Sequence, residues 1–398
     1  MLTQANKIKD EIIRLRRDIH QHPELSFQEF RTAQLVADTL AELGIEAQTE
    51  IGRTGVMAHI GPAEGPTIGI RADMDALPIQ QKSDTPYRSQ NEGIMHACGH
   101  DAHTAMLLGV AQVLQQNYRQ NPAAWYGRVR LLFQPAEETF DEHGVSGATT
   151  MINDGALEGV DAIIALHVAS HLPAGRLFFQ DEYSLAAVDS FEAWIYGDGG
   201  HGAYPHSGSD PIFMLGPILN AIYAIPSRRI NPLHPVVISL GQVSGGAAAN
   251  VIPNEVYLQG TIRSHDEETR SQLAVELERA LRLSESMGGH YKMQLSRGYP
   301  ALYNDPLVNG WLRTATADLL GAETAVSAQF GMGAEDFAYM TRQAKGAMFM
   351  LGAAIDDGLM RPHHTNIFDV DEAVLPLGTA VLAETARRFV TQQYSLTA

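Results

Sequence analysis

The sequence predicts an α/β protein: a mixed, mainly parallel sheet with helices on both faces forms the main unit, and a smaller α+β unit is inserted into it. Helical and strand patterns alternate up to about residue 186 and again after about residue 298, as expected for a mainly parallel sheet. Between these segments the pattern changes to longer alternating strands. The length of 398 residues also favours two units, because a single core stops growing below that size.

The main unit is predicted to span residues 1–186 and 298–398. Apolar residues at helical spacing, such as Ile8, Ile12 and Leu15, predict its first helix. The expected helices cover residues 4–20, 28–43, 102–117, 148–153, 306–320 and 371–391. The expected strands cover residues 46–51, 55–60, 67–72, 129–133, 162–166 and 347–351.

The inserted unit is predicted to span residues 187–297. Its elements follow the order β-α-β-β-α-β, which is typical of the ferredoxin-like split βαβ fold. The strands are expected at residues 189–196, 236–240, 251–263 and 291–296, and the helices at residues 211–224 and 266–287.

Composition argues against several classes of partner. The net charge is −18, whereas nucleic acids and anionic membranes bind basic surfaces. One cysteine cannot form an internal disulfide, which fits a reducing compartment. The N-terminal residues are polar, and no run approaches the roughly 18 apolar residues of a membrane span. We therefore expect a cytoplasmic protein with no nucleic-acid or membrane partner.

The stretch from residue 96 to residue 103 is the densest cluster of potential metal ligands. It holds three histidines, one aspartate and the chain's only cysteine. Imidazole, thiolate and carboxylate groups bind zinc and related ions. Cys98 and His100 are two residues apart and can face one ion, while Gly99 between them lets the backbone bend. A lone cysteine is usually a small hydrophobe, but this density favours a metal site.

Other polar groups follow the predicted strands. Asp73 and Asp75 come after one strand, the pair Glu137 and Glu138 after another, and His167 after a third. Ligands of open α/β sheets bind at the carboxyl ends of strands. Each group alone has a structural interpretation, such as a solvated acidic pair. Their recurrence at one edge of the same sheet predicts a functional site.

Counting donors predicts a pair of metal ions. Five donors suit two ions with a bridging water better than one ion, which takes about four. Glu137, beside a ligand, is the expected base that takes the proton of that water. Asp73 is expected to orient a ligand imidazole through its other nitrogen. The thiolate favours zinc, and manganese, cobalt or nickel remain alternatives. The five predicted ligands are Cys98, His100, Glu138, His167 and His364.

Several motifs together resemble the M20 metallopeptidase family. The match is to its amidohydrolase branch, which includes hippurate hydrolases, N-acyl-amino-acid amidohydrolases and auxin-conjugate hydrolases. The motifs occur in the family's order and span nearly the whole chain. They are RADMDALP from Arg71, MHACGHDAHT from Met95, QPAEE from Gln134, GHGAYPH from Gly200, AEDF from Ala334, and the segment from His364 to Glu372.

The resemblance implies a dinuclear catalytic domain and a lid that also forms dimers, hence a homodimer or a dimer-based tetramer. It implies the same five ligands and the same base, Glu137. It further implies that His201 of the lid lies near the scissile carbonyl as an oxyanion donor. Asn250 and Arg263 resemble the lid residues that hold the free carboxylate of a small-molecule substrate.

The sequence departs from the family pattern at a few positions. Ala334 stands where glycine or serine is common. His171 stands where the family often has a proline after the segment that contains His167. The segment 139–146 is longer than usual and adds His143, to which no role is assigned.

Two adjacent histidines, His363 and His364, leave the last ligand open to an error of one position. His364 is chosen because its spacing to Phe368 matches the family pattern.

The favoured function is metal-dependent hydrolysis of the amide bond in N-acyl or N-aminoacyl amino acids. The alternative within enzymes is a dipeptidase or carboxypeptidase that acts on short peptides. A non-catalytic metal-bound or amino-acid-binding protein is a third hypothesis, against which Glu137 and the full ligand set argue. The sequence does not fix the acyl group, the side-chain preference or the native metal.

Overall fold

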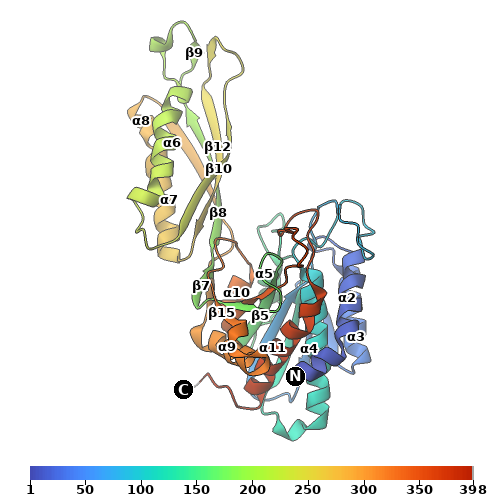
Figure 1. Cartoon of the computed structure of the whole chain (residues 1–398). Helices are drawn as coiled ribbons and strands as arrows, with labels where there is room; N and C mark the ends of the chain where they lie inside the picture. The colour runs from blue at the N-terminus through green and yellow to red at the C-terminus, as the bar shows by residue number, and fades with distance from the viewer. Residues whose placement is uncertain (397–398) are drawn as a thin grey trace. The chain divides into compact units, whose positions relative to one another are not determined.

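The computed structural model describes residues 1–396 and divides into two compact units (Figure 1). Unit 1 comprises Met1–Glu182, Tyr303–Phe330 and the chain from Tyr339 on. Unit 2 comprises Tyr183–Leu302 and Gly331–Ala338. Unit 2 thus begins and ends a few residues outside the predicted 187–297, and it includes an octapeptide that the sequence had assigned to the main unit.

Unit 1 is built on a mixed sheet of eight strands in the order β1-β2-β4-β3-β5-β16-β6-β15. The central strands β4, β3, β5 and β16 are mutually parallel, and β1 and β2 add an antiparallel edge. The fold class expected from the alternating pattern is therefore confirmed. The strands are β1 Ala47–Ile51, β2 Gly55–Ile60, β3 Thr67–Asp73, β4 Arg128–Gln134, β5 Ala162–Ala169, β6 Leu177–Phe179, β15 Ala325–Ser327 and β16 Lys345–Gly352.

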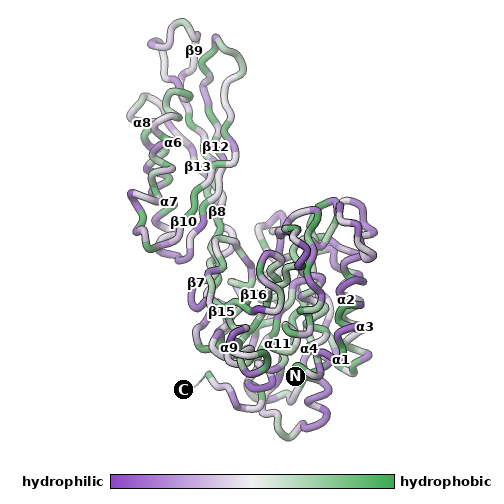
Figure 2. The backbone as a smooth tube through the Cα atoms, viewed as in Figure 1, coloured by the Kyte–Doolittle hydropathy of each residue, from purple (hydrophilic) through white to green (hydrophobic). Residues whose placement is uncertain are grey.

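The central strands are buried on both faces. All seven residues of β3 are buried, including those that alternate between the two faces. Helices α4 (His100–Gln120) and α11 (Leu375–Val390) pack against β3 and against each other, and α2 (Lys9–Gln21) packs on α4. Figure 2 shows hydrophobic residues along these inner elements and hydrophilic ones along α2. The sheet therefore holds its strand ends in a rigid frame.

Further helices complete unit 1. Asp305 caps α9 by accepting the backbone N–H groups of Leu307 and Val308, at 2.9 and 3.2 Å. The remaining elements of the unit and its borders are α1 Leu2–Lys7, α3 Phe30–Glu42, α5 Gly147–Asn153, α9 Pro306–Leu320, α10 Phe337–Thr341, the strands β7 Glu182–Leu185 and β14 Leu302–Asn304, and the short 3₁₀ turns at Pro122–Ala124, Ala322–Thr324 and Glu372–Val374.

Unit 2 is a four-stranded antiparallel sheet in the order β10-β12-β8-β13, with α6 and α7 packed on it. Residues of β8 alternate between buried and less buried positions, so one face of this sheet forms the core with the helices. This is the strand order of a split βαβ unit. Its elements are β8 Ala187–Tyr196, β9 Gly200–His201, a 3₁₀ turn at Pro205–Ser207, α6 Pro211–Arg228, β10 Val236–Ser244, β11 Val251–Ile252, β12 Glu255–Ser264, α7 Glu267–Leu281, α8 Leu283–Ser286 and β13 His290–Arg297.

Some predicted elements are divided in the structure. The helix expected over residues 4–20 is two helices that meet at Ile8, and the strand expected over 251–263 is two strands. Pro253 separates the two strands because it has no N–H to donate to a ladder. The three-residue strands β6 and β15 are too short for a periodic pattern to reveal.

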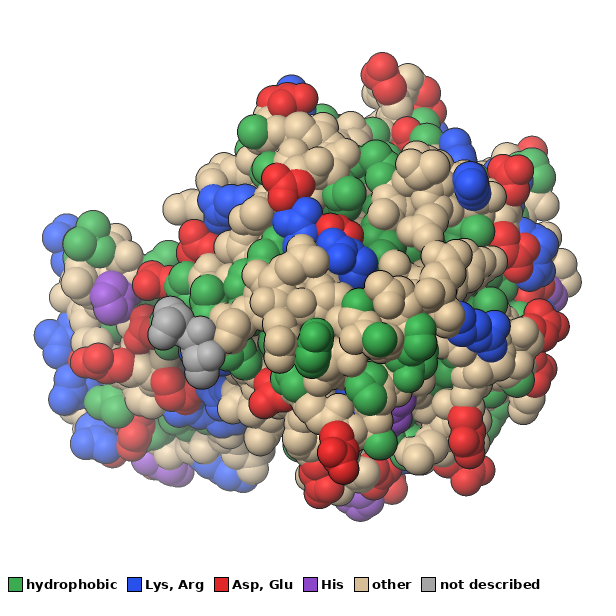
Figure 3. Space-filling view, turned by 90° about the horizontal axis from the view of Figure 1, so that it is seen from below, with side chains coloured by type: hydrophobic (Ala, Val, Ile, Leu, Met, Phe, Trp, Pro, Cys, Tyr) green, Lys and Arg blue, Asp and Glu red, His purple; other side chains and the backbone are tan. Residues whose placement is uncertain are grey.

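The surface carries charges of both signs. On the face shown in Figure 3, acidic and basic side chains alternate with uncharged and apolar ones, so this face does not present a single sign of charge. Among residues 1–396, no helix is long and apolar enough to cross a membrane.

Candidate metal centre

The predicted ligands lie where the parallel strands of unit 1 end. Asp73 ends β3 beside Gln134, the last residue of β4, and β4 leads directly to Glu137 and Glu138. His167 lies near the end of β5, which is parallel to β3. The expectation that these groups share one edge of the sheet is therefore met for the residues of unit 1.

A left-handed glycine sets the direction of the cysteine loop. Gly99 has a φ of 94° and precedes α4, which starts at His100, two residues earlier than predicted. A Cβ on Gly99 would lie 2.2 Å from Cγ2 of Val168. Only glycine fits this close approach and this backbone conformation. His100 therefore stands in the first turn of α4, with Cys98 just outside it.

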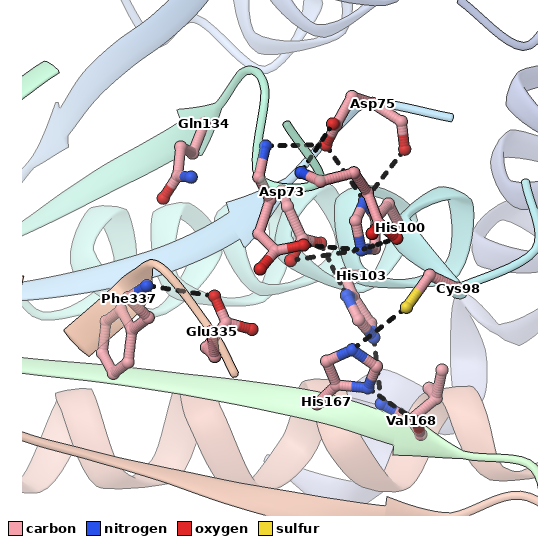
Figure 4. A network of polar contacts seen from close by, with 12 residues as sticks. Asp73, Asp75, Cys98, His100, His103, Gln134, His167, Val168, Glu335 and Phe337 are labelled. Atoms are coloured by element: carbon pink, nitrogen blue, oxygen red, sulfur yellow. Dashed lines mark hydrogen bonds and ion pairs between the residues drawn. The ribbon is translucent and has the colours of Figure 1, made fainter. Parts of the chain in front are cut away.

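Hydrogen bonds leave the inner nitrogens of two histidines free for a metal. Nδ1 of His167 donates to the carbonyl of Val168 at 2.7 Å, so its Nε2 carries a lone pair and faces Sγ of Cys98 at 3.5 Å. Nδ1 of His100 donates to the backbone and side-chain oxygens of Asp75, at 2.9 and 3.1 Å. Nε2 of His100 is buried without a hydrogen-bond partner among the described residues. Figure 4 shows Asp75 beside His100, and Cys98 facing His167.

Glu138 connects the remaining predicted ligands. Its Oε1 lies 3.2 Å from Nε2 of His364 and 3.8 Å from Nε2 of His100. Cys98, Glu138 and His364 form one group whose donor atoms lie within 4.8 Å of one another, and Cys98, His100 and His167 form another. A third such group contains His100, Glu138 and Glu137. The structure thus brings all five predicted ligands together in overlapping sets.

The spacing of these donor atoms fits metal coordination. Two ligand atoms bonded to one ion at about 2.0–2.3 Å and a tetrahedral angle lie roughly 3.3–3.7 Å apart. The separations of 3.2, 3.5 and 3.8 Å lie within about 0.1 Å of this range. Lone pairs of sulfur, nitrogen and oxygen that face one another repel unless a proton or a metal cation lies between them. The donor set is therefore suited to divalent ions that accept nitrogen, oxygen and sulfur ligands.

The electrostatics of the ligands agree with this arrangement. Burial disfavours the charged form of His100, but Asp73 and Asp75 outweigh it and raise its pKa to about 10. Burial, reinforced by Glu138 and Glu137, raises the pKa of the Cys98 thiol well above its usual value. These negative charges would stabilise a bound dication, which in turn favours the neutral imidazole and the thiolate.

Asp75 organises the centre more than Asp73 does. Besides His100, Asp75 accepts the backbone N–H groups of Glu137 and Glu138, at 3.1 and 3.0 Å. The predicted orienting role of Asp73 differs from the structure: Asp73 approaches the metal-facing Nε2 of His100, at 3.6 Å, and not its Nδ1. The chain leaves β3 after Asp73, and this allows the next aspartate to reach the outer side of the ring.

Asp73 instead fixes His103, whose role the sequence had not assigned. Oδ1 of Asp73 accepts Nδ1–H of His103 at 2.6 Å, and Nε2 of His103 accepts the N–H of Val168 at 2.9 Å. Both ring nitrogens are engaged, so His103 is not available as a ligand in this arrangement. Burial lowers its pKa to about 4, and it therefore stays neutral. Its position one helical turn after His100 was the available sequence signal.

Two residues next to ligands adopt strained backbone conformations. Ala136, just before Glu137, has a φ of 44°, and His364 has a φ of 60°. Left-handed conformations of residues other than glycine cost on the order of 1–3 kcal/mol and persist where the surroundings enforce them. Here the N–H of Ala136 donates to Glu29 at 2.9 Å, and the N–H of His364 donates to the carbonyl of Ala97 at 2.8 Å. These bonds direct Glu137, Glu138 and His364 toward the centre.

The three predicted substrate-contacting residues belong to unit 2. His201 is exposed on β9 and pairs with Val251, and the N–H of Gly202 donates to the carbonyl of Asn250 at 2.8 Å. His201 and Asn250 are thus close to each other. Arg263 is half-buried near the other end of β12 and pairs with Val188. At about 3.4 Å per residue, the length of β12 separates Arg263 from the β9 end of the sheet, so one chain does not bring Arg263 to Asn250.

The structure also shows the surroundings of the three residues that depart from the family pattern. His143 is exposed in a turn where Asp141 accepts its N–H at 2.9 Å. The ring of His171 lies 6.2 Å from that of His363. Ala334 precedes Glu335 in unit 2, and Glu335 accepts the N–H of Phe337 at 3.0 Å (Figure 4).

The donor set is suited to a metal centre, and comparison with known proteins gives the family of the chain. The model of peptidase family M20/M25/M40 matches residues 69–388. The chain is 40% identical over 393 residues to a thermostable carboxypeptidase of Saccharolobus solfataricus, covering 97% of each chain. It is 42% identical over 302 residues to an N-acyl-L-amino acid amidohydrolase of Geobacillus stearothermophilus, covering 75% of this chain and 80% of the relative.

A solved structure agrees with both sequence relatives. The structure of a Bacillus subtilis protein described as a dinuclear metal-binding peptidase of the M20 family superposes with a TM-score of 0.83 at 33% identity. The superposition covers 97% of this chain and 99% of that one. The chain therefore belongs to the M20 peptidase family and is a hydrolase.

Proposed function

We propose that this chain is a dinuclear amidohydrolase that cleaves the amide bond of N-acyl or N-aminoacyl amino acids to a carboxylic acid and a free amino acid. The carrying observation is the cluster of Cys98, His100, Glu138, His167 and His364 with Glu137 beside it. We propose two divalent ions as its cofactor, with zinc favoured by the thiolate. Two ions in such a site polarise the substrate carbonyl and lower the pKa of an attacking water.

Residues of the chain transfer the proton of the attacking water and orient the substrate. Glu137 takes it from the attacking water and delivers it to the leaving amine, so that the C–N bond breaks with a neutral amine product. The N–H of Glu137 is held by Asp75 at 3.1 Å, which fixes the start of this side chain relative to the ligands. His201 is proposed to donate a hydrogen bond to the carbonyl oxygen in the transition state. Asn250 and Arg263 are proposed to hold the free carboxylate, from different chains in view of their separation.

We also propose that residues 187–297 act as a lid and dimerisation domain in a cytoplasmic homodimer or dimer-based tetramer. Unit 2 has a hydrophobic core of its own, formed by buried residues of its sheet and helices. A self-contained core allows such a unit to move as a body when substrate binds.

A second candidate function is hydrolysis of dipeptides or longer peptides with a free carboxyl terminus. The similarity to a carboxypeptidase supports it at nearly the same identity as the similarity to an amidohydrolase. Both reactions would use the same centre and release an amino acid from the nitrogen side of the scissile amide. They differ in the group on the carbonyl side, which is an acyl group in one case and an aminoacyl or peptidyl group in the other.

A substrate panel decides between the two. Metal-stripped protein is reconstituted separately with zinc, manganese, cobalt or nickel and assayed on benzoyl-glycine, N-acetyl amino acids and unblocked dipeptides. We expect the highest kcat/KM on an acylated amino acid. Higher kcat/KM on unblocked dipeptides would favour the peptidase, and a metal-replete protein inactive on the whole panel would contradict both.

A further inference from the structure

His363 precedes the proposed ligand His364, and its ring lies against Cys98 of the candidate metal centre. Its Nδ1 is 3.6 Å from Sγ of Cys98, and Nε2 of His167 lies 3.5 Å from the same sulfur.

The hydrogen bonding of His363 defines which nitrogen carries the proton. Its Nε2 accepts the backbone N–H of Ser170, at 3.5 Å. A backbone N–H can only donate, so Nε2 must hold a lone pair, and in the neutral ring the proton is then on Nδ1. Nδ1–H is the nitrogen directed at the sulfur of Cys98.

The ring is held in this orientation from several sides. The hydroxyl of Ser170 donates to the carbonyl of Arg361 at 2.7 Å, which ties the end of β5 to the loop that carries His363. The ring also packs on Phe368 and on His167, with centroid separations of 5.0 and 5.3 Å. A donor that is fixed before the metal arrives loses little entropy when its hydrogen bond forms.

We propose that His363 is a positioning residue that donates a hydrogen bond from Nδ1 to the metal-bound thiolate of Cys98. A hydrogen bond to a ligand sulfur stabilises its negative charge, which favours the metal-binding thiolate over the thiol, and loss of such partners typically lowers metal affinity. The inference rests on the proposed metal centre, in which Cys98 is a ligand. It assigns the adjacent histidines different tasks, since His364 contacts Glu138 and His363 contacts Cys98.

Three substitutions isolate the N–H to sulfur contact. His363→Phe keeps a flat ring of similar size and removes the donor. His363→Asn places an amide N–H near the position of Nδ1 and keeps the donor. His363→Gln places its amide near Nε2, on the side of Ser170, and serves as the control for polarity without a donor to sulfur.

The readout is the cobalt-substituted protein, observed without substrate. The sulfur-to-cobalt charge-transfer band in the near ultraviolet reports the electron density on the thiolate. In His363→Phe and His363→Gln we expect this band to shift to longer wavelength and the apparent affinity for cobalt to fall about tenfold. In His363→Asn we expect both values to return toward those of the parent protein.

The outcomes separate this inference from the proposed function. A parent protein with two bound cobalt ions and no sulfur charge-transfer band would contradict Cys98 as a ligand, and with it the proposed centre. A band that is present in the parent and unchanged, with unchanged affinity, in all three variants would overturn the role of His363 alone. If His363→Phe does not fold, as judged by circular dichroism, the comparison of the Asn and Gln variants decides the question.

Discussion

The ionisable residues around Cys98 fall into two groups whose charges are compensated in different ways. We call the side with Asp101 the back of the cysteine loop and the side with the proposed ligands Cys98 and His100 its front. Behind the loop, Asp101 accepts hydrogen bonds from Arg16 at 2.9 Å and from His20 at 2.8 Å, and all three side chains are buried. In front of it, Cys98 and His100 face acceptors and lone pairs. Arg16 neutralises the buried aspartate behind the loop, whereas the carboxylates in front raise the pKa of His100 and would stabilise bound cations.

This comparison separates structural from functional ionisable residues within one short stretch. Asp101 and His100 are adjacent in sequence and equally buried. Asp101 belongs to a closed network in which Arg16 also binds Asp369 at 2.6 Å and Glu372 at 3.0 Å. A buried group with an opposite charge from the chain stabilises the fold, and a buried group that faces others of the same polarity indicates a ligand site.

The largest effect is expected at the front of the loop, from Glu137→Gln. The amide cannot take a proton from water, so kcat should fall about a thousandfold, within the usual range for general bases. Metal content, measured by atomic emission, should stay the same because the five proposed ligands are unchanged. A variant that keeps the parent kcat would show that another group is the base.

The next effect is expected behind the loop, from Arg16→Met. The substitution leaves Asp101 and Asp369 buried without their cation, which should lower the free energy of unfolding by about 3–5 kcal/mol. Urea denaturation followed by circular dichroism measures this loss.

Arg17→Met is the matched control for Arg16. Arg17 is on the same helix and binds Glu372 at 2.5 Å, but its side chain is 46% exposed. Its loss should cost about 1 kcal/mol or less. Equal losses for the two variants would contradict the view that the interior network is structural.

A smaller effect, on metal affinity, is expected from Asp75→Asn. Asp75 binds both His100 and the backbone of Glu137 and Glu138. The new amide would direct N–H groups at backbone donors that now bind the carboxylate, so His100 and the glutamate turn should be held less firmly. Apparent zinc affinity should fall about 10-fold or more, as for other residues that orient ligands.

Ser26→Ala provides the control for Asp75. Ser26 donates a hydrogen bond to Oδ2 of Asp75 at 2.7 Å, and its removal leaves the contacts to His100 and the glutamates intact. Competition titration with a chromophoric chelator compares both variants with the parent. A loss in Ser26→Ala as large as in Asp75→Asn would locate the effect elsewhere.

Acid should weaken the interior network in a defined direction. Burial opposes ionisation of Asp101 and Asp369, but Arg16 outweighs it, and both carboxyl groups have a pKa below the usual value. Their contribution is therefore complete above about pH 4, the ordinary aspartate pKa, and is lost as the pH falls toward the lowered values. Unfolding free energies measured from pH 6 down to pH 3 should fall more steeply for the parent than for Arg16→Met.

The sequence predicted the parts of the fold and centre that depend on strong local patterns. The buried strands β3, β4 and β5 follow from apolar runs, and most of the proposed ligands follow from dense polar groups near strand ends. His364 was preferred to His363 only by its spacing in the family pattern. The local pattern could not decide between Asp73 and Asp75 as the residue that orients His100. Both lie at the end of β3, and only the path of the following loop determines which one reaches Nδ1 of His100.

Long-range pairing was also beyond the local pattern. The contact of His363 with Cys98 joins residues 265 positions apart, and adjacent histidines look alike in sequence. The position of Arg263 depends on strand register: its pairing with Val188 places it away from the β9 end of the sheet. The salt bridges of Arg16 similarly depend on how α2 packs on α4.

The most direct test is anomalous diffraction at the zinc absorption edge from crystals of the zinc-reconstituted protein. The proposed centre predicts two peaks about 3.5–4 Å apart. Cys98, His100, Glu138, His167 and His364 should lie within bonding distance of one or both. Peaks located away from Cys98 and His364, or no peak at the ends of β3, β4 and β5, would contradict it.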